Sequence, residues 1–287
     1  MKIAIIISGH MRTYHPYVKF LKGFFMDHDY DIFIFTHREN YIKLNYAIEQ
    51  PLIKINDVTL TDLQSHYGKN LKVAEFYEDN SQKEKRKLYR IKEMLAKRIK
   101  KYNLQISEQY IDQYYCFYRA FGICETYLNE NSIKYDIVVR FRPDMMINSK
   151  IKLECDNNVL RVFGYINENN HSYVNDLFFF GDFNIMKKMS TFVLYYYSTL
   201  EEKYLLAFAD RLFLILAPEP QLGYFISKIG IKYIISQINV HFYNDCRKCH
   251  ACVRIRSEFE KYKEYYERFT KRHPFYKSLD DINMIIV

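Results

Sequence analysis

The stretch Lys2-Ile-Ala-Ile-Ile-Ile-Ser-Gly-His-Met-Arg-Thr13 begins as a nearly continuous run of aliphatic side chains and ends in polar ones. Such a run is typical of a strand that is buried on both faces of a parallel sheet. Residues 16–25 follow with apolar side chains at helical spacing, and residues 31–35 form a second apolar run that ends in Thr36-His37. This order of strand, turn, helix and strand predicts the opening of a nucleotide-binding α/β fold.

The rest of the chain continues the alternation of strand and helix patterns. Further strands are predicted at 51–55, 71–77, 136–141, 145–147, 159–163, 176–181 and 231–235. Helices are predicted at 82–102, 108–128, 185–197, 221–229 and 257–273. The fold class is therefore α/β, with a mostly parallel central sheet flanked by helices.

Residues 1–287 show no internal repeat and no linker rich in Pro and Gly, which predicts a single domain. Within it we expect a helical hairpin at about 82–129 and a Cys-containing, helical C-terminal extension at about 241–287.

The chain carries 42 Lys and Arg against 34 Asp and Glu, a formal net charge of +8. This excess favours anionic partners such as phosphate ligands, lipid surfaces or acidic glycans, and does not require nucleic acid. No stretch reaches the roughly 18 apolar residues of a spanning helix, and no signal-peptide pattern is present, so we expect a cytoplasmic protein. The basic segment 83–101 predicts either a solvated helix face or a peripheral contact with an anionic membrane.

The polar residues after the first apolar run form one candidate binding site. Gly9 allows the backbone to approach a ligand closely, and Arg12 would lie near the carboxyl end of the strand, where open α/β sheets bind ligands. The alternative is a simple turn from strand to helix, with Thr13 as the cap.

A second candidate site follows the strand pattern in Tyr135-Asp-Ile-Val-Val-Arg-Phe-Arg-Pro-Asp144. Because Arg140 and Arg142 alternate with Phe141, both guanidinium groups are predicted to lie on one face of the chain. Burying this charged set without partners is costly. A diphosphate with a divalent cation would satisfy it, since Arg suits phosphate oxygens and Asp144 suits Mg²⁺ or Mn²⁺. An internal ion pair between Arg and Asp144 is the alternative.

Two further carboxylates and several histidines are candidates for chemistry. Asp176 begins an apolar strand pattern, and Glu219 lies at the start of a helix pattern, where the macrodipole favours a carboxylate. Each is either a general base or only a cap. Three histidines are candidates for contact with a substrate, namely His10, His37 and His171. The alternative for each is a structural or surface role.

The six cysteines of a cytoplasmic protein predict thiols or metal ligands rather than disulfides. Cys246, Cys249, His250 and Cys252 lie within seven residues and are candidate zinc ligands. The adjacent Cys249 and His250 do not easily reach one tetrahedral ion, so reduced surface thiols are the alternative. Attachment of a c-type haem is disfavoured because no secretory signal is present.

Four motifs occur in a recognisable order, at residues 2–13, 31–37, 135–144 and 175–181. In this order they resemble the glycosyltransferases of bacterial surface-polysaccharide clusters and large DNA viruses, which are similar to the GT-A group of nucleotide-sugar enzymes. The resemblance spans roughly residues 1–230. It implies a GT-A-like fold and the transfer of a hexose or pentose from a nucleoside diphosphate, such as UDP, to a glycan or lipid-linked acceptor in polysaccharide biosynthesis.

The resemblance also implies roles for individual residues. Ser8, Gly9, Arg12, Thr36 and His37 would hold the nucleotide.

Asp144 would take the place of the metal-binding Asp-x-Asp motif and hold Mn²⁺ or Mg²⁺, and Asp176 or Glu219 would be the general base. This chain has Arg142 where that motif has its first Asp, so Arg140 and Arg142 could neutralise the diphosphate themselves.

Two other classes of function compete with this interpretation. A sulfo-, phospho- or nucleotidyltransferase would also use an Arg-lined site, although the chain lacks the Gly-x-x-x-x-Gly-Lys-Ser/Thr loop of P-loop enzymes. A zinc- or nucleic-acid-binding interaction module would be built on the basic segment and the Cys cluster, but no nucleic-acid partner is expected if the glycosyltransferase resemblance holds.

Overall fold

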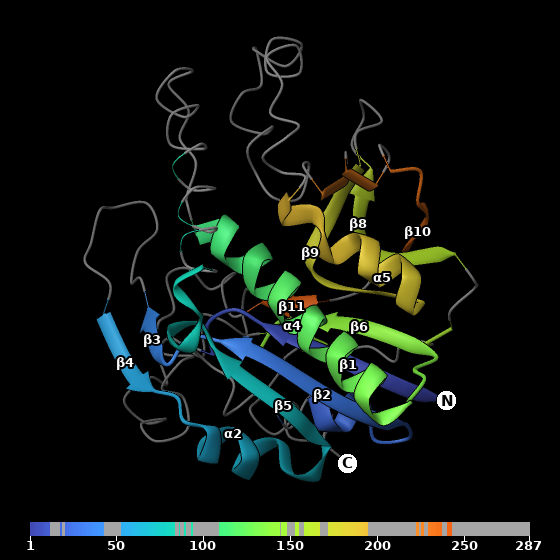
Figure 1. Ribbon diagram of the computed structural model, residues 1–287. Coiled ribbons are helices and arrows are strands. Elements are labelled where there is room, and N and C mark those ends of the chain that lie inside the picture. The colour runs from blue at the N-terminus through green and yellow to red at the C-terminus, as the bar shows by residue number, and fades with distance from the viewer. Residues whose placement is uncertain are drawn as a thin grey trace, which may run out of the picture.

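A seven-stranded mixed sheet with the strand order β10-β8-β9-β6-β1-β2-β5 lies at the centre of the protein (Figure 1). The computed structural model describes residues 1–11, 18, 21–42, 53–83, 86, 89, 93, 109–143, 145–147, 153–154, 158–166, 172–194, 222–223, 225–226, 229–236 and 240–242. The strands of the large sheet are β1 (Lys2–Ser8), β2 (Asp29–Thr36), β5 (Leu71–Phe76), β6 (Ile137–Phe141), β8 (Val159–Ile166), β9 (Ser172–Gly181) and β10 (Lys232–Ser236).

Strand β1 lies between β2 and β6 and runs parallel to both. Its residues from Ile3 to Ile7 are fully buried, because helices cover both faces of the sheet at this point. β-branched side chains pack well on such a pleated surface. The prediction of a doubly buried strand from the aliphatic run is confirmed.

The direction of the strands makes the sheet mostly parallel. The pairs β1–β2, β1–β6, β2–β5 and β8–β10 are parallel, whereas β9 is antiparallel to both β6 and β8. The predicted α/β class with a mostly parallel sheet is confirmed. Because β1, β2, β5 and β6 all run the same way, their carboxyl ends meet at one edge of the sheet.

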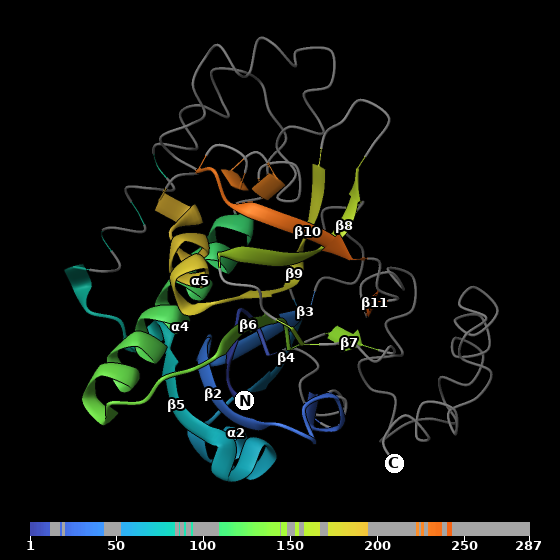
Figure 2. The same cartoon turned by 90° about the vertical axis from the view of Figure 1, so that its right-hand side faces the viewer.

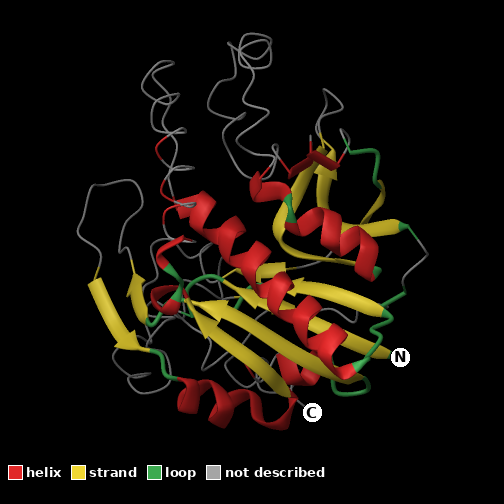
Figure 3. Cartoon of the chain, viewed as in Figure 1, coloured by secondary structure: helices red, strands yellow, loops and turns green. Residues whose placement is uncertain are grey.

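Helix α4 (Gln109–Asn131) lies across one face of the sheet, with α5 (Phe183–Ser190) beside it (Figures 1 and 3). The core on this face joins α4 side chains such as Phe117 and Phe121 to Ala4 and Ile6 of β1. Helix α5 begins where the side chain of Asp182 accepts a hydrogen bond from the backbone N–H of Ile185 at 2.9 Å. Such a cap satisfies one of the free N–H groups at a helix start.

The opposite face is covered by the described helical residues 18 and 21–24 and by α2 (Leu60–Tyr67). Their buried side chains pack against Ile3, Ile5 and Ile7, which alternate along β1 with the residues of the other core. Helix α2 was not predicted, since no helix was expected between the strand patterns at 51–55 and 71–77. Its start is set by a capping box between Thr59 and Asp62, a sequence signal that the polar composition of the segment obscured.

Two small antiparallel ribbons lie outside the large sheet (Figure 2). One pairs β3 (Glu39–Ile42) with β4 (Ile53–Asp57), and the other pairs β7 (Met145–Ile147) with β11 (Val240–Phe242). Strands β3 and β11 were not predicted, because strands this short depend on a distant partner rather than on a local pattern.

Several predicted elements lie partly or wholly outside the described residues. Of the predicted helix at 82–102, the described positions 82, 83, 86, 89 and 93 are helical, and the turn of the expected hairpin is not described. Of the expected C-terminal extension at 241–287, residues 241–242 are described and belong to β11 rather than to a helix. No helix in the described part of the chain is both long and apolar enough to cross a membrane.

A buried carboxylate connects strands at the amino edge of the sheet. Asp31 Oδ2 accepts a hydrogen bond from the hydroxyl of Tyr135 at 2.8 Å, and its carboxylate lies 3.4 Å from Lys2 Nζ and 3.2 Å from Lys72 Nζ. Burial, together with the hydrogen bond to Asp31, raises the pKa of Tyr135, so the phenol stays a donor. These contacts join β1, β2, β5 and the residues that lead into β6.

We expect Asp31→Asn to lower the free energy of unfolding by about 1–3 kcal/mol, measured by urea denaturation. The cost is moderated because both lysine side chains are about a third exposed (33% and 30%) and can recover water. Asp29→Asn, an exposed position on the same strand, is the matched control and should change stability by less than about 0.5 kcal/mol. Equal effects of the two substitutions would contradict a structural role for this carboxylate.

Candidate functional site

The candidate site lies at the edge where β1, β2, β5 and β6 end. The chain passes from β1 to β2 on one side of β1, while β6 pairs with β1 on the other side, so the order of strands reverses at β1. Ligands of open α/β sheets bind at the carboxyl ends of the strands at such a point. The residues that follow the four strands therefore form the candidate site.

Alternation along the strands places three of the predicted binding residues on the face covered by α4. Ser8 continues the α4-facing positions of β1, and Arg140 and Arg142 share one face at the end of β6. The Arg140 guanidinium carbon lies 4.7 Å from the centre of the Phe117 ring, and Arg142 Nη1 donates to Gln113 Oε1 at 3.4 Å. Both contacts are with α4, which confirms that the two arginines lie on one face.

Arg140 is fully buried among aromatic rings. Its guanidinium lies over Tyr114, Phe117 and Phe179, at 5.5, 4.7 and 5.6 Å from the ring centres. Cation–π contacts of this kind offset part of the cost of burying the charge. Arg140 therefore adds positive charge beneath the edge, whereas the half-buried Arg142 is the arginine that a ligand can reach.

Gly9 and Thr36 hold the backbone where β1 and β2 end. Gly9 has φ 103°, a left-handed conformation that glycine adopts without strain. Its N–H donates to Phe35 O at 3.2 Å, and its carbonyl accepts from Thr36 Oγ1 at 2.7 Å. Because the Thr36 hydroxyl is buried and used in this way, Thr36 shapes the edge rather than offering a free group to a ligand.

Ser8 differs from Thr36 in this respect. Its side chain is 1% exposed, and its hydroxyl has no hydrogen-bond partner in the part of the chain that the structure describes. Leaving a buried hydroxyl unsatisfied costs about 1–3 kcal/mol. Such a group at the end of a central strand is suited to a polar atom of a ligand.

His37 is surrounded by four side chains, which come from the turn after β1, from the 3₁₀ helix at 77–79 and from α4. Its ring stacks on His10, with centres 4.3 Å apart and planes at 16°, and lies 4.7 Å from the ring of Tyr77. Its Nδ1 is 3.3 Å from Glu78 Oε1, and its Nε2 is 3.9 Å from Cys116 Sγ. The ring of His37, which was predicted to bind the nucleotide, is thus held by contacts with its face and with both of its nitrogens.

Glu78, in the 3₁₀ helix η2 (Tyr77–Asp79), was not among the predicted site residues. Glu78 Oε2 accepts from the backbone N–H of Arg38 at 2.9 Å, and Asp79 forms an ion pair with the Arg38 guanidinium. Burial would raise the pKa of Glu78, but hydrogen bonds from His37 and the Arg38 N–H outweigh it and lower the pKa to about 2. The position of Glu78 directly after the apolar run 71–77 was the sequence signal that could have identified it.

Cys116, on α4, is a buried free thiol, as is Cys124. Burial and the nearby Asp112 raise the pKa of Cys116, which keeps the thiol protonated. A protonated, inaccessible thiol is a poor nucleophile. Cys116 is therefore not a candidate for a covalent step.

The other predicted site residues are described only in part. Asp176 belongs to β9 and precedes by two residues Phe178, which pairs with Phe141 at the end of β6. Its backbone therefore lies at the same edge as the residues above. The predicted residues outside the described part of the chain are Arg12, Asp144, His171, Glu219 and the Cys246–Cys252 cluster. Among the residues that are described, no group of three His, Cys, Asp or Glu could hold a metal ion.

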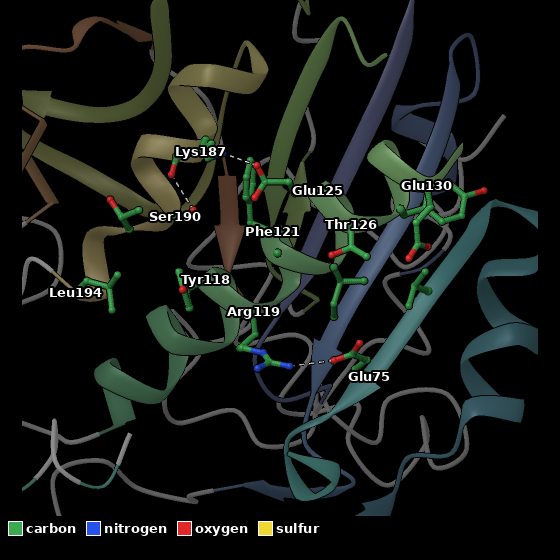
Figure 4. A pocket seen from close by; sticks show the side chains of 15 residues that line it. Glu75, Tyr118, Arg119, Phe121, Glu125, Thr126, Glu130, Lys187, Ser190 and Leu194 are labelled. Atoms are coloured by element: carbon green, nitrogen blue, oxygen red, sulfur yellow. Dashed lines mark hydrogen bonds and ion pairs between the residues drawn. The ribbon is translucent and has the colours of Figure 1, made fainter. Parts of the chain in front are cut away.

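A groove of about 640 Å³ lies elsewhere, along the outer side of α4 between β5 and α5 (Figure 4). Ion pairs between Glu75 and Arg119 and between Glu125 and Lys187 border it. None of the site residues at the carboxyl edge lines this groove. The groove and the edge at the strand ends are thus separate features, and the candidate site residues lie at the edge.

The low pKa of Glu78 predicts a pH dependence of stability. The pKa is about 2 in the folded protein against an ordinary value of 4.5, so the stabilisation is fully present above about pH 4.5 and is lost as the pH falls towards 2. The free energy of unfolding, measured with urea, should be higher for wild type than for Glu78→Gln above pH 4.5, and this difference should shrink as the pH falls towards 2. The effect is reduced by solvent, since the side chain is 37% exposed. A difference that is independent of pH would contradict the prediction.

Comparison with known proteins finds structural similarity only. No protein-family model and no curated protein matches the chain. Similar solved structures include a glycosyltransferase involved in glycosylation of the major capsid of PBCV-1, with 13% identity, 83% of each chain covered and a TM-score of 0.34. The galactosyltransferase LgtC, in complex with donor and acceptor sugar analogues, has 9% identity, covers 81% of this chain and 73% of its own, and scores 0.37.

A third similar structure is described as a glucose-1-phosphate thymidylyltransferase from Bacillus anthracis in complex with sucrose, with 12% identity, 90% and 96% coverage and a TM-score of 0.37. Two of the three structures are glycosyltransferases, the class that the sequence motifs resemble.

Proposed function

We propose that this protein is a glycosyltransferase that moves a sugar from a nucleoside diphosphate, such as UDP, to the hydroxyl of a glycan or lipid-linked acceptor. The observation that carries the proposal is the meeting of Ser8, His37 and Arg142 at the carboxyl ends of neighbouring parallel strands, above the buried charge of Arg140. These positions belong to the motifs on which the sequence resemblance rests.

Three features of the edge favour the diphosphate. Arg142 offers a guanidinium that can contact two phosphate oxygens at once, and Arg140 adds a second positive charge in a medium of low dielectric constant. Helix α4 also begins near this edge, since Gln113 in its second turn accepts from Arg142. The amino end of a helix carries partial positive charge and favours anions.

We place the nucleoside on the side of β1 that pairs with β2, where polar and aromatic groups lie. The stacked rings of His10 and His37, backed by Tyr77, form a rigid aromatic wall, and the Ser8 hydroxyl is available to a ligand oxygen or nitrogen. The tight turn at Gly9 lets the ligand approach the backbone.

The proposed reaction is a displacement at the anomeric carbon. The acceptor oxygen forms a bond to that carbon while the bond from carbon to the diphosphate oxygen breaks, and a carboxylate accepts the hydroxyl proton. Asp176, whose backbone lies at the same edge, and Glu219 are the proposed bases. The negative charge on the departing diphosphate is stabilised by Arg142 and Arg140.

We propose Asp144 as a ligand of Mn²⁺ or Mg²⁺ from the sequence, because a carboxylate suits either ion and the resemblance places Asp144 at the metal-binding motif. Among the described residues of the edge, no group of three His, Cys, Asp or Glu side chains could hold a metal ion, so these residues do not by themselves fit a metal-centred clamp. The neutralisation of the diphosphate is therefore assigned to the arginines.

We also propose that the protein acts in the cytoplasm and makes a peripheral contact with an anionic membrane surface, where a lipid-linked acceptor would lie. The net charge of +8 and the basic segment 83–101 support this proposal.

A thermal-shift screen of nucleotide sugars, with and without Mn²⁺, tests the proposed activity. At least one donor should raise the unfolding temperature, since a ligand of the native state stabilises it. Arg142→Gln should weaken binding of that donor by about 10–100-fold, because a charge-assisted contact is lost. Arg119→Gln, on the groove side of α4, is the matched control and should bind normally. Absence of any response in the wild type, together with salt-sensitive nucleic-acid binding, would favour an interaction module instead.

The role of Asp144 is tested by the same titration in the presence of Mn²⁺. Wild type should bind the donor more tightly with the metal than without it, and Asp144→Asn should lose that gain because a carboxylate ligand is removed. Binding that gains equally from Mn²⁺ in both proteins would show that Asp144 is structural.

A further inference from the structure

The environment of His37 distinguishes its two ring nitrogens. The stack with His10 and the contact with Tyr77 define the plane of the ring but not its flip within that plane, because the two flipped rings have nearly the same shape. The flip is decided by what Nδ1 and Nε2 contact. Nδ1 faces Glu78 Oε1 at 3.3 Å, and Nε2 faces Cys116 Sγ at 3.9 Å.

We propose that Glu78 is a positioning residue that fixes His37 in one orientation, as the tautomer with its proton on Nδ1, and thereby sets the ring for the donor nucleotide. The part of this inference that concerns the donor rests on the proposed function, whereas the part that concerns the ring is a property of the free protein.

The chemistry of the partners determines the tautomer. Glu78 remains ionised, with a pKa of about 2, and a carboxylate only accepts hydrogen bonds, so the proton must be on Nδ1. Cys116 keeps its thiol hydrogen because burial raises its pKa, and a thiol is a weak donor. The unprotonated Nε2 is then the acceptor on that side. Both ring nitrogens thus have a complementary partner in a single tautomer.

The carboxylate of Glu78 is also fixed relative to the end of β2, so it can hold the His37 ring in one orientation. While Oε1 faces the ring, Oε2 accepts from the backbone N–H of Arg38 at 2.9 Å. One carboxylate therefore holds the side chain of His37 and the backbone of the next residue at once. The neighbouring Asp79 binds the Arg38 guanidinium instead, and this difference makes it a suitable control.

Glu78→Gln tests the proposal because glutamine has one acceptor oxygen where glutamate has two. If that oxygen keeps the Arg38 N–H, the amide NH₂ faces Nδ1 of His37 and requires it to be unprotonated. The proton then moves to Nε2. The substitution retains the shape of the side chain, so the variant should fold.

Long-range ¹H–¹⁵N spectra of the free, ¹⁵N-labelled protein provide the first readout, with His37→Asn used to assign the signals. Wild type and Asp79→Asn should show Nδ1 protonated and Nε2 unprotonated, and Glu78→Gln should shift the population towards the Nε2–H tautomer. A wild-type ring protonated on Nε2, or the same tautomer in wild type and Glu78→Gln, would overturn the proposal.

Titration with the donor found in the screen provides the second readout. Glu78→Gln should weaken donor binding by about tenfold and raise KM with little change in kcat, because an interaction made equally in the ground and transition states is disturbed. Asp79→Asn should stay within about twofold. Unchanged donor binding in Glu78→Gln would refute the role in positioning, whereas a wild type that binds no nucleotide sugar would refute the proposed function and leave the tautomer to the spectra.

Discussion

The parallel pairing of β1 with both β2 and β6 is the constraint on which the rest of this structure depends. It buries Ile3 to Ile7 from both sides and brings the carboxyl ends of neighbouring strands to one edge. It also sets the face on which each side chain lies, with Ile6 opposite Arg140 and Ser8 opposite Phe35. A slip of one residue in β6 would turn Arg140 away from the aromatic rings of α4 and into the other core.

Charged residues at the two edges of the sheet serve different purposes. At the amino edge Asp31 is enclosed by Lys2, Lys72 and Tyr135, and its charge is balanced within the protein. At the carboxyl edge the buried Arg140 lies against aromatic rings, and the half-buried Arg142 contacts a neutral glutamine. The contacts of the first edge hold the strands together, whereas the second edge places two arginines and the buried Ser8 hydroxyl at the strand ends, where the phosphorylated ligand is proposed to bind.

The local sequence pattern predicted the strands that have long apolar runs. It did not predict the short strands that form only by pairing with a distant segment. The run 2–7 and the alternation around Phe141 were enough to place β1, β6 and the shared face of the two arginines. Strands β3 and β11 were missed because each has only three or four residues and exists by pairing with another segment. Glu78 was missed because its value as a site residue comes from His37, which lies 41 positions earlier in the chain.

By itself the sequence determined the α/β class, the central buried strand and the spacing that puts arginines on one face, because these follow from local periodicity and the cost of exposing apolar side chains. Only the tertiary structure decided that Arg140 lies beneath the edge, that Thr36 is used internally, and that Glu78 and Cys116 face opposite nitrogens of His37. These facts depend on strand order and on the packing of α4, which bring together residues that no local pattern relates.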